Sequence, residues 1–535
     1  MKDILTAPFM EEMRKATANM YRLGWDERNG GNISYLLNAE EIGEYLDISR
    51  VIRTIPLGFD ASALCGKIFI VTGTGKYFKN VDAQPETNLG IVRIANDGKN
   101  AELLWGYRDG GKFTSEFPGE EKIRCVDDNE EALLWRLRMI GTAKESIVLS
   151  TFDLRADNSG TDLIAALNHA AEKGVKIRLL IDGIYQRLFL DGSRDFQALA
   201  ARDNVEVGIY NPITPLNLFR LNYRMHDKYV IVDDKMYLLG GRNSNDIFLG
   251  DKTTGINMDR DILVYDTSAG KGESLQQLEQ YFQKIWAESS VKSKGQGRNT
   301  EEKYSVQYQS LEERYTSLKE KYSDIETYHS WEKDTIPVNK ITLIDNGTQA
   351  GAKNPLVLQT IDYLTENASE VIIQTPYVIC NSYMYEVLEK IADHAQLDLV
   401  INAVEKGSNP WGCTDYLNQK KRIQKTGATV YELMNEHAVH TKAVLIDDRL
   451  SVVGSYNLDM RSTYLDTELM LVIDSRELNQ QIRETEKIYQ EKSKKVQSDG
   501  QEKEGTQYQK KTLNWQKKLF YGVLRVAIWP IRQLL

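Results

Sequence analysis

The sequence predicts an α/β protein in which two similar α/β halves pack as a pseudo-dimer, preceded by a separate, shorter α/β segment. Three observations lead to this fold class. Short apolar strands alternate with helical stretches through most of the chain, a pattern typical of sheets covered by helices. A polar motif of matched spacing occurs twice, near residues 226 and 440. The first 118 residues lack that motif and are rich in glycine turns instead.

Composition limits the class of protein. The chain has 535 residues, too many for one core, so about three domains are expected. Hydrophobic residues make up 41% and charged residues 27%, as in globular proteins, and the net charge of −10 excludes an overall basic surface for nucleic acid. The scattered cysteines form no C-x-x-C pair, which indicates neither a disulfide framework nor a zinc site. They are Cys65, Cys125, Cys380 and Cys413.

Three glycine-rich or polar stretches mark the segment 1–118: GWDERNGGNIS, KIFIVTGTGK and TSEFP. Together they resemble the N-terminal part of rhamnulose-1-phosphate aldolases, of the class II aldolase family. The resemblance implies a phosphate grip, with a glutamate as catalytic acid/base. The residues concerned are Asn29, Asn32, Thr74, Gly75, Ser115 and Glu116.

The aldolase resemblance stops near Pro118, and the histidines that the family uses to hold Zn²⁺ are missing. Of the six histidines, His169 comes first, and no H-x-H pair follows Glu116. Without a Lewis acid the enediolate of an aldolase is not stabilised. We therefore expect an inactive aldolase fragment with no metal. Two origins stay open, a natural fusion and an artefact of gene assembly.

The first half begins near Glu120 and alternates helices with strands. Helical patterns cover 131–140 and 163–167, and strands are expected at 146–150, 175–182, 226–232 and 261–265. Such alternation favours a mostly parallel sheet covered on both faces. Strands at 369–375 and 397–401 repeat this pattern in the second half.

The motif H-x-K-x4-D occurs as His226–Asp233 and as His440–Asp447. In both copies an asparagine follows the histidine by seventeen residues, as Asn243 and Asn457. Side chains alternate along a strand, so the histidine and lysine of each copy point the same way. A matched pair of such sites is rarely accidental, and it is suited to an anionic oxygen group.

From about residue 120 to 490 the chain resembles the phospholipase D superfamily, which carries this motif twice. The resemblance implies that one histidine forms a phosphohistidine while the other protonates the leaving alcohol, and that no cofactor is needed. The usual assignment in the family makes His226 the nucleophile and His440 the acid. In each half an acidic side chain would accept a hydrogen bond from a histidine N–H. The implied catalytic residues are His226, Lys228, Asp233, Asp261, His440, Lys442, Asp447 and Glu468, and the implied phosphate ligands are Asn243, Ser455 and Asn457. Asp233 and Asp447 are expected to stabilise the motif rather than react, and Gly241 stands where the second copy has Ser455.

Three further segments lie outside the repeated halves. The polar insert 287–337 has tyrosines and leucines at helical spacing, which favours helices packed against the domains. The tail 491–512 is polar and is expected to be flexible. The stretch LNWQKKLFYGVLRVAIWPIRQLL is a cationic amphipathic helix too charged to cross a bilayer. Docking on the protein and lying in a membrane surface both stay open. The expected domains are 1–118, 119–286, 287–337, 338–490 and 491–535.

The favoured function is a phospholipase D-type phosphodiesterase or phosphatidyltransferase, cardiolipin synthase-like. Its expected partners are a phospholipid substrate and a membrane surface, with a cytoplasmic location on the inner face of the cell membrane. A nuclease of the same superfamily is the alternative, and the acidic balance argues against it. Lipid head group, acceptor, hydrolysis versus transfer, and oligomeric state are left open.

Overall fold

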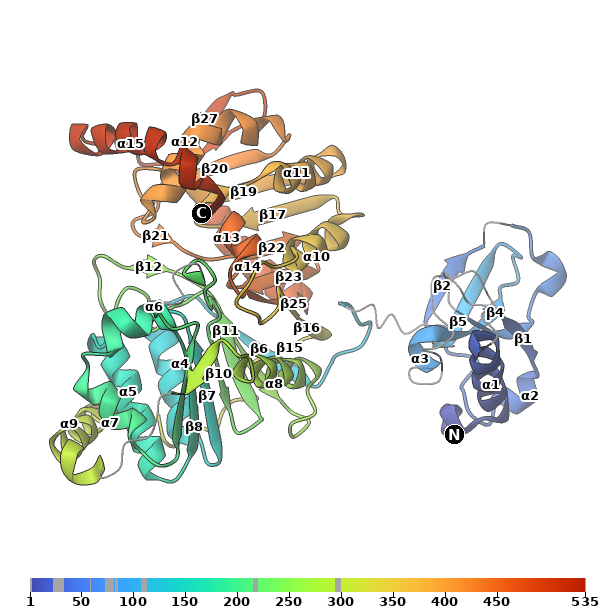
Figure 1. Cartoon of the computed structure of the whole chain (residues 1–535). Helices are drawn as coiled ribbons and strands as arrows, with labels where there is room; N and C mark the ends of the chain where they lie inside the picture. Colours follow the sequence, from blue (N-terminus) through green and yellow to red (C-terminus); the bar gives the residue numbers. More distant parts are fainter. Residues whose placement is uncertain are drawn as a thin grey trace. The chain divides into compact units, whose positions relative to one another are not determined.

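The structure is a computed structural model of the whole chain (Figure 1). It describes residues 2–22, 33–57, 59–72, 81, 85–106, 113–214, 220–293 and 300–534. The chain divides into two compact units, Met1–Phe117 and Pro118–Leu535. The border lies where the aldolase resemblance ends in the sequence.

Unit 1 is a five-stranded antiparallel sheet with one long helix. The strand order is β1-β3-β4-β5-β2. Helix α1 (Pro8–Arg22) buries Phe9, Met10 and Met13 in a core that also contains Ile70 and Ile91 of the sheet. The strands are β1 (Ser34–Leu37), β2 (Arg53–Pro56), β3 (Ile68–Thr72), β4 (Leu89–Ile94) and β5 (Asn100–Gly106), and the short helices are α2 (Ala39–Ile42) and α3 (Pro85–Asn88).

The first half of unit 2 is built on a nine-stranded sheet of order β14-β9-β8-β7-β10-β11-β13-β6-β15. Its strands are β6 (Glu121–Val126), β7 (Ser146–Thr151), β8 (Lys176–Asp182), β9 (Val205–Tyr210), β10 (Tyr229–Val232), β11 (Met236–Gly240), β13 (Asp261–Asp266), β14 (Val291–Ser293) and β15 (Ile336–Pro337). The expectation of a mostly parallel sheet is wrong, because only β7, β8 and β9 run parallel. A tight turn with positive φ at Asp233 and Asp234 joins β10 to β11, which makes these neighbours antiparallel.

The second half repeats this arrangement in a sheet of order β16-β25-β23-β22-β17-β19-β20-β26-β27. Here β17, β19 and β20 are the parallel strands, and β22 stands in the place of β10. The strands are β16 (Lys340–Asp345), β17 (Glu370–Gln374), β19 (Gln396–Asn402), β20 (Thr429–Leu433), β22 (Ala443–Ile446), β23 (Leu450–Gly454), β25 (Leu469–Asp474), β26 (Ser493–Val496) and β27 (Glu502–Glu504).

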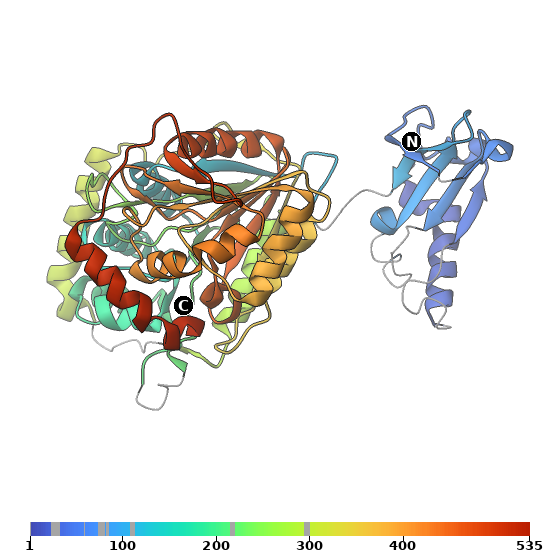
Figure 2. The ribbon, with the colours of Figure 1, turned by 90° about the horizontal axis from the view of Figure 1, so that it is seen from above.

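Helices cover the two sheets from the outside, and one large core joins the halves. In that core Ile231 and Leu239 of the first sheet pack together with Leu445 and Leu471 of the second. Figure 2 shows helices around the margin of this unit and strands within it. The covering helices are α4 (Asn129–Thr142), α5 (Asn158–Glu172), α7 (Arg194–Ala200), α8 (Glu273–Trp286), α10 (Leu356–Thr365), α11 (Ser382–His394), α12 (Pro410–Lys425) and α14 (Arg476–Glu491).

The polar insert forms one long helix, α9 (Thr300–Lys321), which lies against α5 and α7 (Figure 1). Its Tyr304, Leu311 and Tyr315 are buried in the core of the first half. The ring of Tyr315 stacks on His169 of α5, with centroids 4.0 Å apart. The prediction that the aromatic residues of the insert pack against the domains is confirmed.

The expectation of a flexible stretch from 491 to 512 is wrong. Strand β26 pairs with β20 and β27 with β26, so this stretch extends the second sheet. Backbone hydrogen bonds to an existing sheet edge order a polar segment that has few apolar residues of its own. Helix α15 (Trp515–Ala527) follows and contacts α12.

Candidate active site

Each histidine lies just before the first residue of a buried strand, with its lysine two residues on. His226 and Lys228 precede β10, and His440 and Lys442 precede β22. The lysine side chains are almost fully buried. Nζ of Lys228 donates to the carbonyl oxygen of His226 at 2.5 Å, and Lys442 bonds to the carbonyl of His440 in the same way. Both lysine charges are therefore held beside their histidines.

Each histidine is paired with an acid from the other half. Nδ1 of His226 lies 2.9 Å from Oε1 of Glu468, and Nδ1 of His440 lies 2.7 Å from Oδ2 of Asp259. A carboxylate at Nδ1 fixes the tautomer and the orientation of the ring. The exchange brings both motifs to one site between the halves.

Short backbone contacts hold the two halves together at this point. The backbone N–H of His440 donates to the carbonyl of Met258 at 2.7 Å, where β12 (Asn257–Met258) pairs with β21 (Ala438–Val439). On the other side, the N–H of His226 donates to Oγ1 of Thr467 at 3.1 Å. Each histidine is thus fixed by the residue that precedes the acid of the opposite half.

The acid expected at Asp261 is found two residues earlier, at Asp259. In the sheet Gly240 pairs with Asp261 and Gly454 pairs with Met470, so Asp259 is the structural counterpart of Glu468. Asp261 is buried away from the histidines, with one carboxylate oxygen 3.0 Å from Nη2 of Arg136. The sequence DRDILVYD offers both aspartates, and only the strand register distinguishes them.

The register also explains why one copy has glycine where the other has serine. A Cβ atom at Gly241 would lie 2.5 Å from Oδ1 of Asp259, so the carboxylate fills the space of a side chain. In the second half Ser455 fits, and its hydroxyl donates to Glu468 and accepts from the N–H of Leu469 at 3.0 Å. Ser455, which the sequence suggested as a phosphate ligand, therefore hydrogen-bonds to the acid Glu468.

Asn243 and Asn457 are buried beside the motifs, 7% and 4% exposed. Within the described chain, the Oδ1 atoms of both side chains are enclosed without a hydrogen-bond partner. Buried polar atoms without partners are uncommon and mark sites where a ligand can bind. Because an amide oxygen only accepts hydrogen bonds, an anionic group could bind these asparagines only through their Nδ2 donors.

Asp233 and Asp447 lie at the opposite ends of their strands from the histidines. Carboxylate oxygens of Asp233 accept from the backbone N–H groups of residues 144–146 at 2.8–3.0 Å. Asp447 accepts from those of Ser369 and Glu370 in the same manner. Both aspartates have positive φ and fix the start of the neighbouring strand. Their expected role in stabilising the motif agrees with this geometry, and neither touches a histidine.

Burial and mutual repulsion shift the pKa of the site's cations. Burial lowers the pKa of Lys228 to about 7 and that of Lys442 to about 8. Burial and the charge of Lys442 lower the pKa of His440 to about 3, and the pKa of His226 also falls well below its usual value. Both imidazoles are therefore neutral near pH 7, and Nζ of Lys442 also lies 3.1 Å from Nε2 of His440.

The two acids differ in charge. Burial raises the pKa of Glu468 to about 8. Burial also acts on Asp259, but Lys442 and the hydrogen bond from His440 outweigh it and hold the pKa of Asp259 well below its usual range. His440 thus faces an ionised carboxylate, whereas the acid behind His226 is neutral at pH 7.

Two phenylalanines, which the sequence analysis did not identify, flank the histidine rings. Phe152 packs edge-on against His226 with centroids 4.8 Å apart, and Phe248 packs against His440 at 5.1 Å. Phe152 directly follows β7 and Phe248 lies in the turn region between β11 and β12; neither has a motif around it, so no sequence signal pointed to them. They place an apolar surface on each side of the site.

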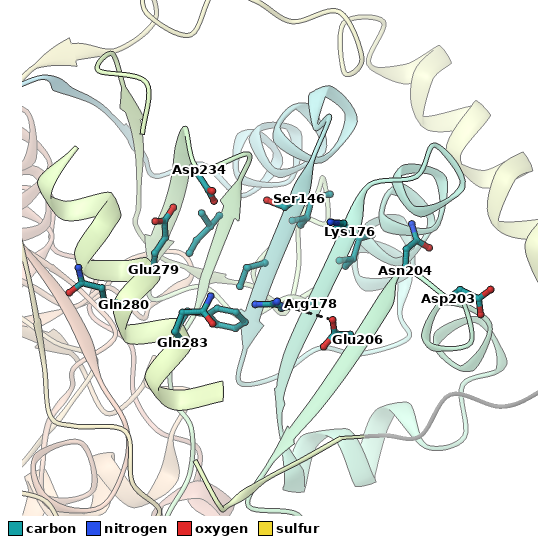
Figure 3. A pocket seen from close by; sticks show the side chains of 15 residues that line it. Ser146, Lys176, Arg178, Asp203, Asn204, Glu206, Asp234, Glu279, Gln280 and Gln283 are labelled. Atoms are coloured by element: carbon teal, nitrogen blue, oxygen red, sulfur yellow. Dashed lines mark ion pairs between the residues drawn. The ribbon is translucent and has the colours of Figure 1, made fainter. Parts of the chain in front are cut away.

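A cavity of about 830 Å³ lies elsewhere in the first half, between strands β7–β9 and helix α8 (Figure 3). Its lining includes Ile231 of β10 but none of the histidines, lysines, aspartates or asparagines of the two motifs. Arg178 and Glu206 on its floor form a long ion pair at 3.9 Å. The cavity is not the active site.

The aldolase-like residues divide into two groups. Asn29, Asn32, Thr74 and Gly75 lie outside the described residues. Ser115 and Glu116 are near the end of unit 1, where the hydroxyl of Ser115 donates to the carbonyl of Phe117 at 2.9 Å. In the described parts of the chain, no cluster of histidine, cysteine and acidic residues could hold a metal ion. Likewise, the helices described there include none able to cross a membrane.

Comparison with known proteins also separates an N-terminal segment from the rest of the chain. An N-terminal segment resembles rhamnulose-1-phosphate aldolases, with 61% identity over 117 residues to that of Listeria monocytogenes and 60% over 116 residues to that of Enterococcus faecalis. The match covers 22% of this chain and 42–43% of those enzymes, so the chain spans less than half of their length.

The rest of the chain matches another group. An uncharacterized protein of Helicobacter pylori is 25% identical over 401 residues, covering 69% of this chain and 79% of that protein. The crystal structure of phosphatidylserine synthase from Haemophilus influenzae superposes with a TM-score of 0.54 at 15% identity, over 77% of this chain and 95% of that one, and shows a shared fold. The family model described as "Cardiolipin synthase, PLD-like domain" matches residues 137–286 and 360–487. These ranges span both histidine motifs and more than half of the chain, which therefore belongs to this phospholipase D-like family.

Proposed function

We propose that the chain is a phosphatidyltransferase or phospholipase D that acts on phospholipid through a phosphohistidine intermediate, with cardiolipin synthase-like transfer as the favoured reaction. One observation carries this proposal. Two neutral histidines, each with Nδ1 beside an acidic side chain of the other half, share a site with two buried lysines. A nucleophile, a general acid and charge for a phosphate are the parts that a double displacement requires.

In the proposed first step, Nε2 of His226 bonds to phosphorus and the bond from phosphorus to the leaving oxygen breaks. His440 donates a proton to that oxygen, which leaves as an alcohol. In the second step His440 takes a proton from an acceptor alcohol or from water. The acceptor oxygen then bonds to phosphorus while the phosphorus–nitrogen bond breaks, and His226 is restored.

The difference between the two acids supports this assignment of roles. An ionised carboxylate at Nδ1 of His440 stabilises the imidazolium that a general acid must form. A bound phosphodiester adds negative charge beside His440, which raises its pKa toward the range where it can carry a proton. Lys228, Lys442 and the two asparagines would balance the charge on the phosphoryl oxygens.

Helix α15 supports membrane contact. Trp515, Leu519, Val523 and Val526 recur along one side and are 62–74% exposed, while Tyr521 and Ile528 face the protein. Its charged residues are all basic: Lys517, Lys518 and Arg525. An exposed apolar stripe flanked by cations suits the surface of an anionic bilayer. One side of helix α15 thus packs on the protein, and the opposite side would contact the membrane.

Product analysis tests the proposed reaction. The full chain is incubated with labelled phosphatidylglycerol vesicles, with and without an added alcohol, and in parallel with DNA. We expect a labelled phosphatidyl product that changes when the alcohol is added, and no cleavage of DNA. Cleavage of DNA without turnover of lipid would instead indicate a nuclease, and the variant His226→Ala serves as the inactive control.

We further propose that unit 1 has no aldolase activity, because no histidine precedes residue 169 to hold the metal of that chemistry. Incubation with rhamnulose 1-phosphate and added Zn²⁺ is expected to give no cleavage. Cleavage that depends on Glu116 would contradict this proposal.

A further inference from the structure

A chain of aromatic contacts leads from the first histidine to the protein surface. The ring of Phe152 touches His226, with centroids 4.8 Å apart, and lies 4.3 Å from the ring of Tyr185. Tyr185 is followed by the ring of Phe189 at 5.9 Å. Exposure rises along this series, since Phe152 and Tyr185 are half-buried, Phe189 is 37% exposed and the adjacent Leu188 is 65% exposed. We call Phe152, Tyr185, Leu188 and Phe189 the aromatic ladder.

The outer part of the ladder is a turn of π-helix, Gln186–Leu190. The turn is anchored to the catalytic segment through Asp182, whose carboxylate accepts from the N–H of Ile184 at 2.9 Å and from that of Met225 at 3.1 Å. Met225 directly precedes His226. The position of the ladder is therefore fixed relative to the nucleophile, and π-turns are often found at functional sites.

A cation accompanies the outer ring. The guanidinium of Arg155 lies 4.5 Å from the centre of the Phe189 ring, and Nη2 of Arg155 pairs with Asp153 at 2.7 Å. The ladder thus presents an apolar strip with a positive group along it. This combination matches a phospholipid, whose acyl chains are apolar and whose ester and phosphate groups are polar and negatively charged.

The same side of the site also holds the end of the C-terminal segment. Arg461 donates through Nη2 to the carbonyl of Asn222 at 3.1 Å and through Nη1 to that of Leu534 at 3.2 Å. Its charge also lowers the otherwise raised pKa of Tyr185, so Arg461 lies near the ladder. The 3-10 turn Trp529–Leu534, which follows α15, therefore ends near Tyr185 of the ladder, and α15 itself runs along the outside of unit 2 in Figure 2.

From this geometry we infer that the aromatic ladder holds an acyl chain of the phospholipid whose phosphorus is attacked by His226. The inference rests on the proposed function and adds where the apolar part of the substrate lies. The occupant is the substrate's own chain, because the ladder is continuous with the ring that touches the nucleophile. The side chains that determine chain-length preference are then Tyr185, Leu188 and Phe189.

The test is a chain-length series with a matched control. The double variant Leu188→Ala/Phe189→Ala is compared with Phe59→Ala/Val306→Ala, which removes exposed apolar side chains elsewhere, 65% and 71% exposed. Substrates are a chromogenic phosphodiester without acyl chains, monomeric phosphatidylglycerols whose acyl chains lengthen from four to eight carbons, and phosphatidylglycerol vesicles. Each substrate gives kcat and KM for the full-length protein.

In the wild-type protein we expect KM to fall as the chains lengthen. In the ladder variant this gain should shrink by about tenfold or more for the longest chain, since each lost side chain removes apolar burial. Turnover of the chromogenic diester should stay within about twofold in both variants. The control should keep the full chain-length dependence.

Three outcomes separate the possibilities. An unchanged chain-length dependence in the ladder variant would overturn the inference. A loss seen only with vesicles, and not with monomeric lipids, would also overturn it and would assign the ladder to contact with the bilayer surface. A wild-type protein that cleaves the chromogenic diester but no phospholipid would refute the proposed function itself.

Discussion

At the scale of single residues, the site depends on which atom of each imidazole is already engaged. Nδ1 of His226 and of His440 is held by Glu468 and Asp259. The histidines, lysines, asparagines and Glu468 could be identified from the sequence because their spacing is repeated. Asp259 could not be distinguished from Asp261, because the choice depends on hydrogen bonds between strands far apart in the chain.

Removal of each histidine should give different results. His226→Ala should abolish reaction with every substrate, because no phosphohistidine can form. His440→Ala should spare the first step with a p-nitrophenyl phosphodiester, whose leaving group needs no proton, and should then accumulate phosphoenzyme because His440 also activates the acceptor. Turnover of phospholipid should fall by about 10²–10⁴-fold. Kinetics with both substrates and trapping of the phosphoenzyme measure this. A phosphoryl group trapped on His440 in the His226→Ala variant would reverse the roles.

The two aspartates before and within β13 provide a matched pair. Asp259→Asn should lower kcat on phospholipid by about 10²–10⁴-fold, because the neutral amide no longer stabilises the His440 imidazolium. Asp261→Asn leaves the buried Arg136 without its ion-pair partner and should reduce the free energy of unfolding by about 3–5 kcal/mol. Steady-state kinetics and thermal unfolding of both variants separate the effects. Equal loss of kcat in the two folded proteins would argue against the assignment of Asp259.

The lysine pKa values predict a pH dependence of binding. With pKa values of about 7 for Lys228 and about 8 for Lys442, the doubly charged site loses positive charge as pH rises through this window. A dialkyl phosphate keeps a single negative charge throughout, so its affinity should fall from about pH 6 to about pH 9. The inhibition constant measured across this range tests the claim. In Lys228→Met the affinity should be lower at pH 6 and change less with pH, and a rising wild-type affinity would contradict it.

At the scale of elements, local sequence patterns predicted where strands and helices lie better than they predicted which strands pair with each other. The apolar runs before Asp233 and Asp447 formed the strands expected of them. Their antiparallel pairing was missed because pairing is decided by turns and by partners that lie far away in sequence. Strands β26 and β27 were missed for a related reason, since their order comes from the edge of β20 and not from their own side chains.

Helix α15 allows a direct test of membrane contact. Val523→Asp and Val526→Asp place a charge in the exposed stripe, and each should weaken binding to anionic vesicles by about tenfold or more through lost apolar burial. Cosedimentation with vesicles is the measurement. Val306→Asp, on helix α9, alters a side chain of similar exposure and should bind as the wild type does. Equal binding by all three variants would refute membrane contact through this helix.

At the scale of the whole molecule, the division at Phe117 and Pro118 separates a part with the features of one enzyme family from a part with those of another. The sequence predicted this division because the glycine-rich stretches of residues 1–118 and the doubled histidine motif are each specific to one family. The five-stranded sheet of unit 1 could not be anticipated in detail, since its resemblance covers only part of an aldolase.

A shortened chain starting at Gly119 should therefore retain its phosphodiester chemistry. Every motif residue and its acid partner lies in Pro118–Leu535, so kcat/KM for a chromogenic diester should remain within about twofold of the full chain. Circular dichroism confirms folding of the shortened protein, and His226→Ala in the same background gives the blank. Complete loss of activity in a folded protein would show that unit 1 contributes to the reaction.

The exchange of acids between the halves has an evolutionary consequence. Because Glu468 orients His226 and Asp259 orients His440, a half on its own would have a histidine without its acid. An ancestor with a single copy of the motif would have needed a second subunit to complete its site. After duplication and fusion, selection on each acid is exerted through the opposite repeat. The two repeats can therefore diverge in most of their sequence. The residues around Glu468 and Asp259 must change together with the histidine of the opposite repeat.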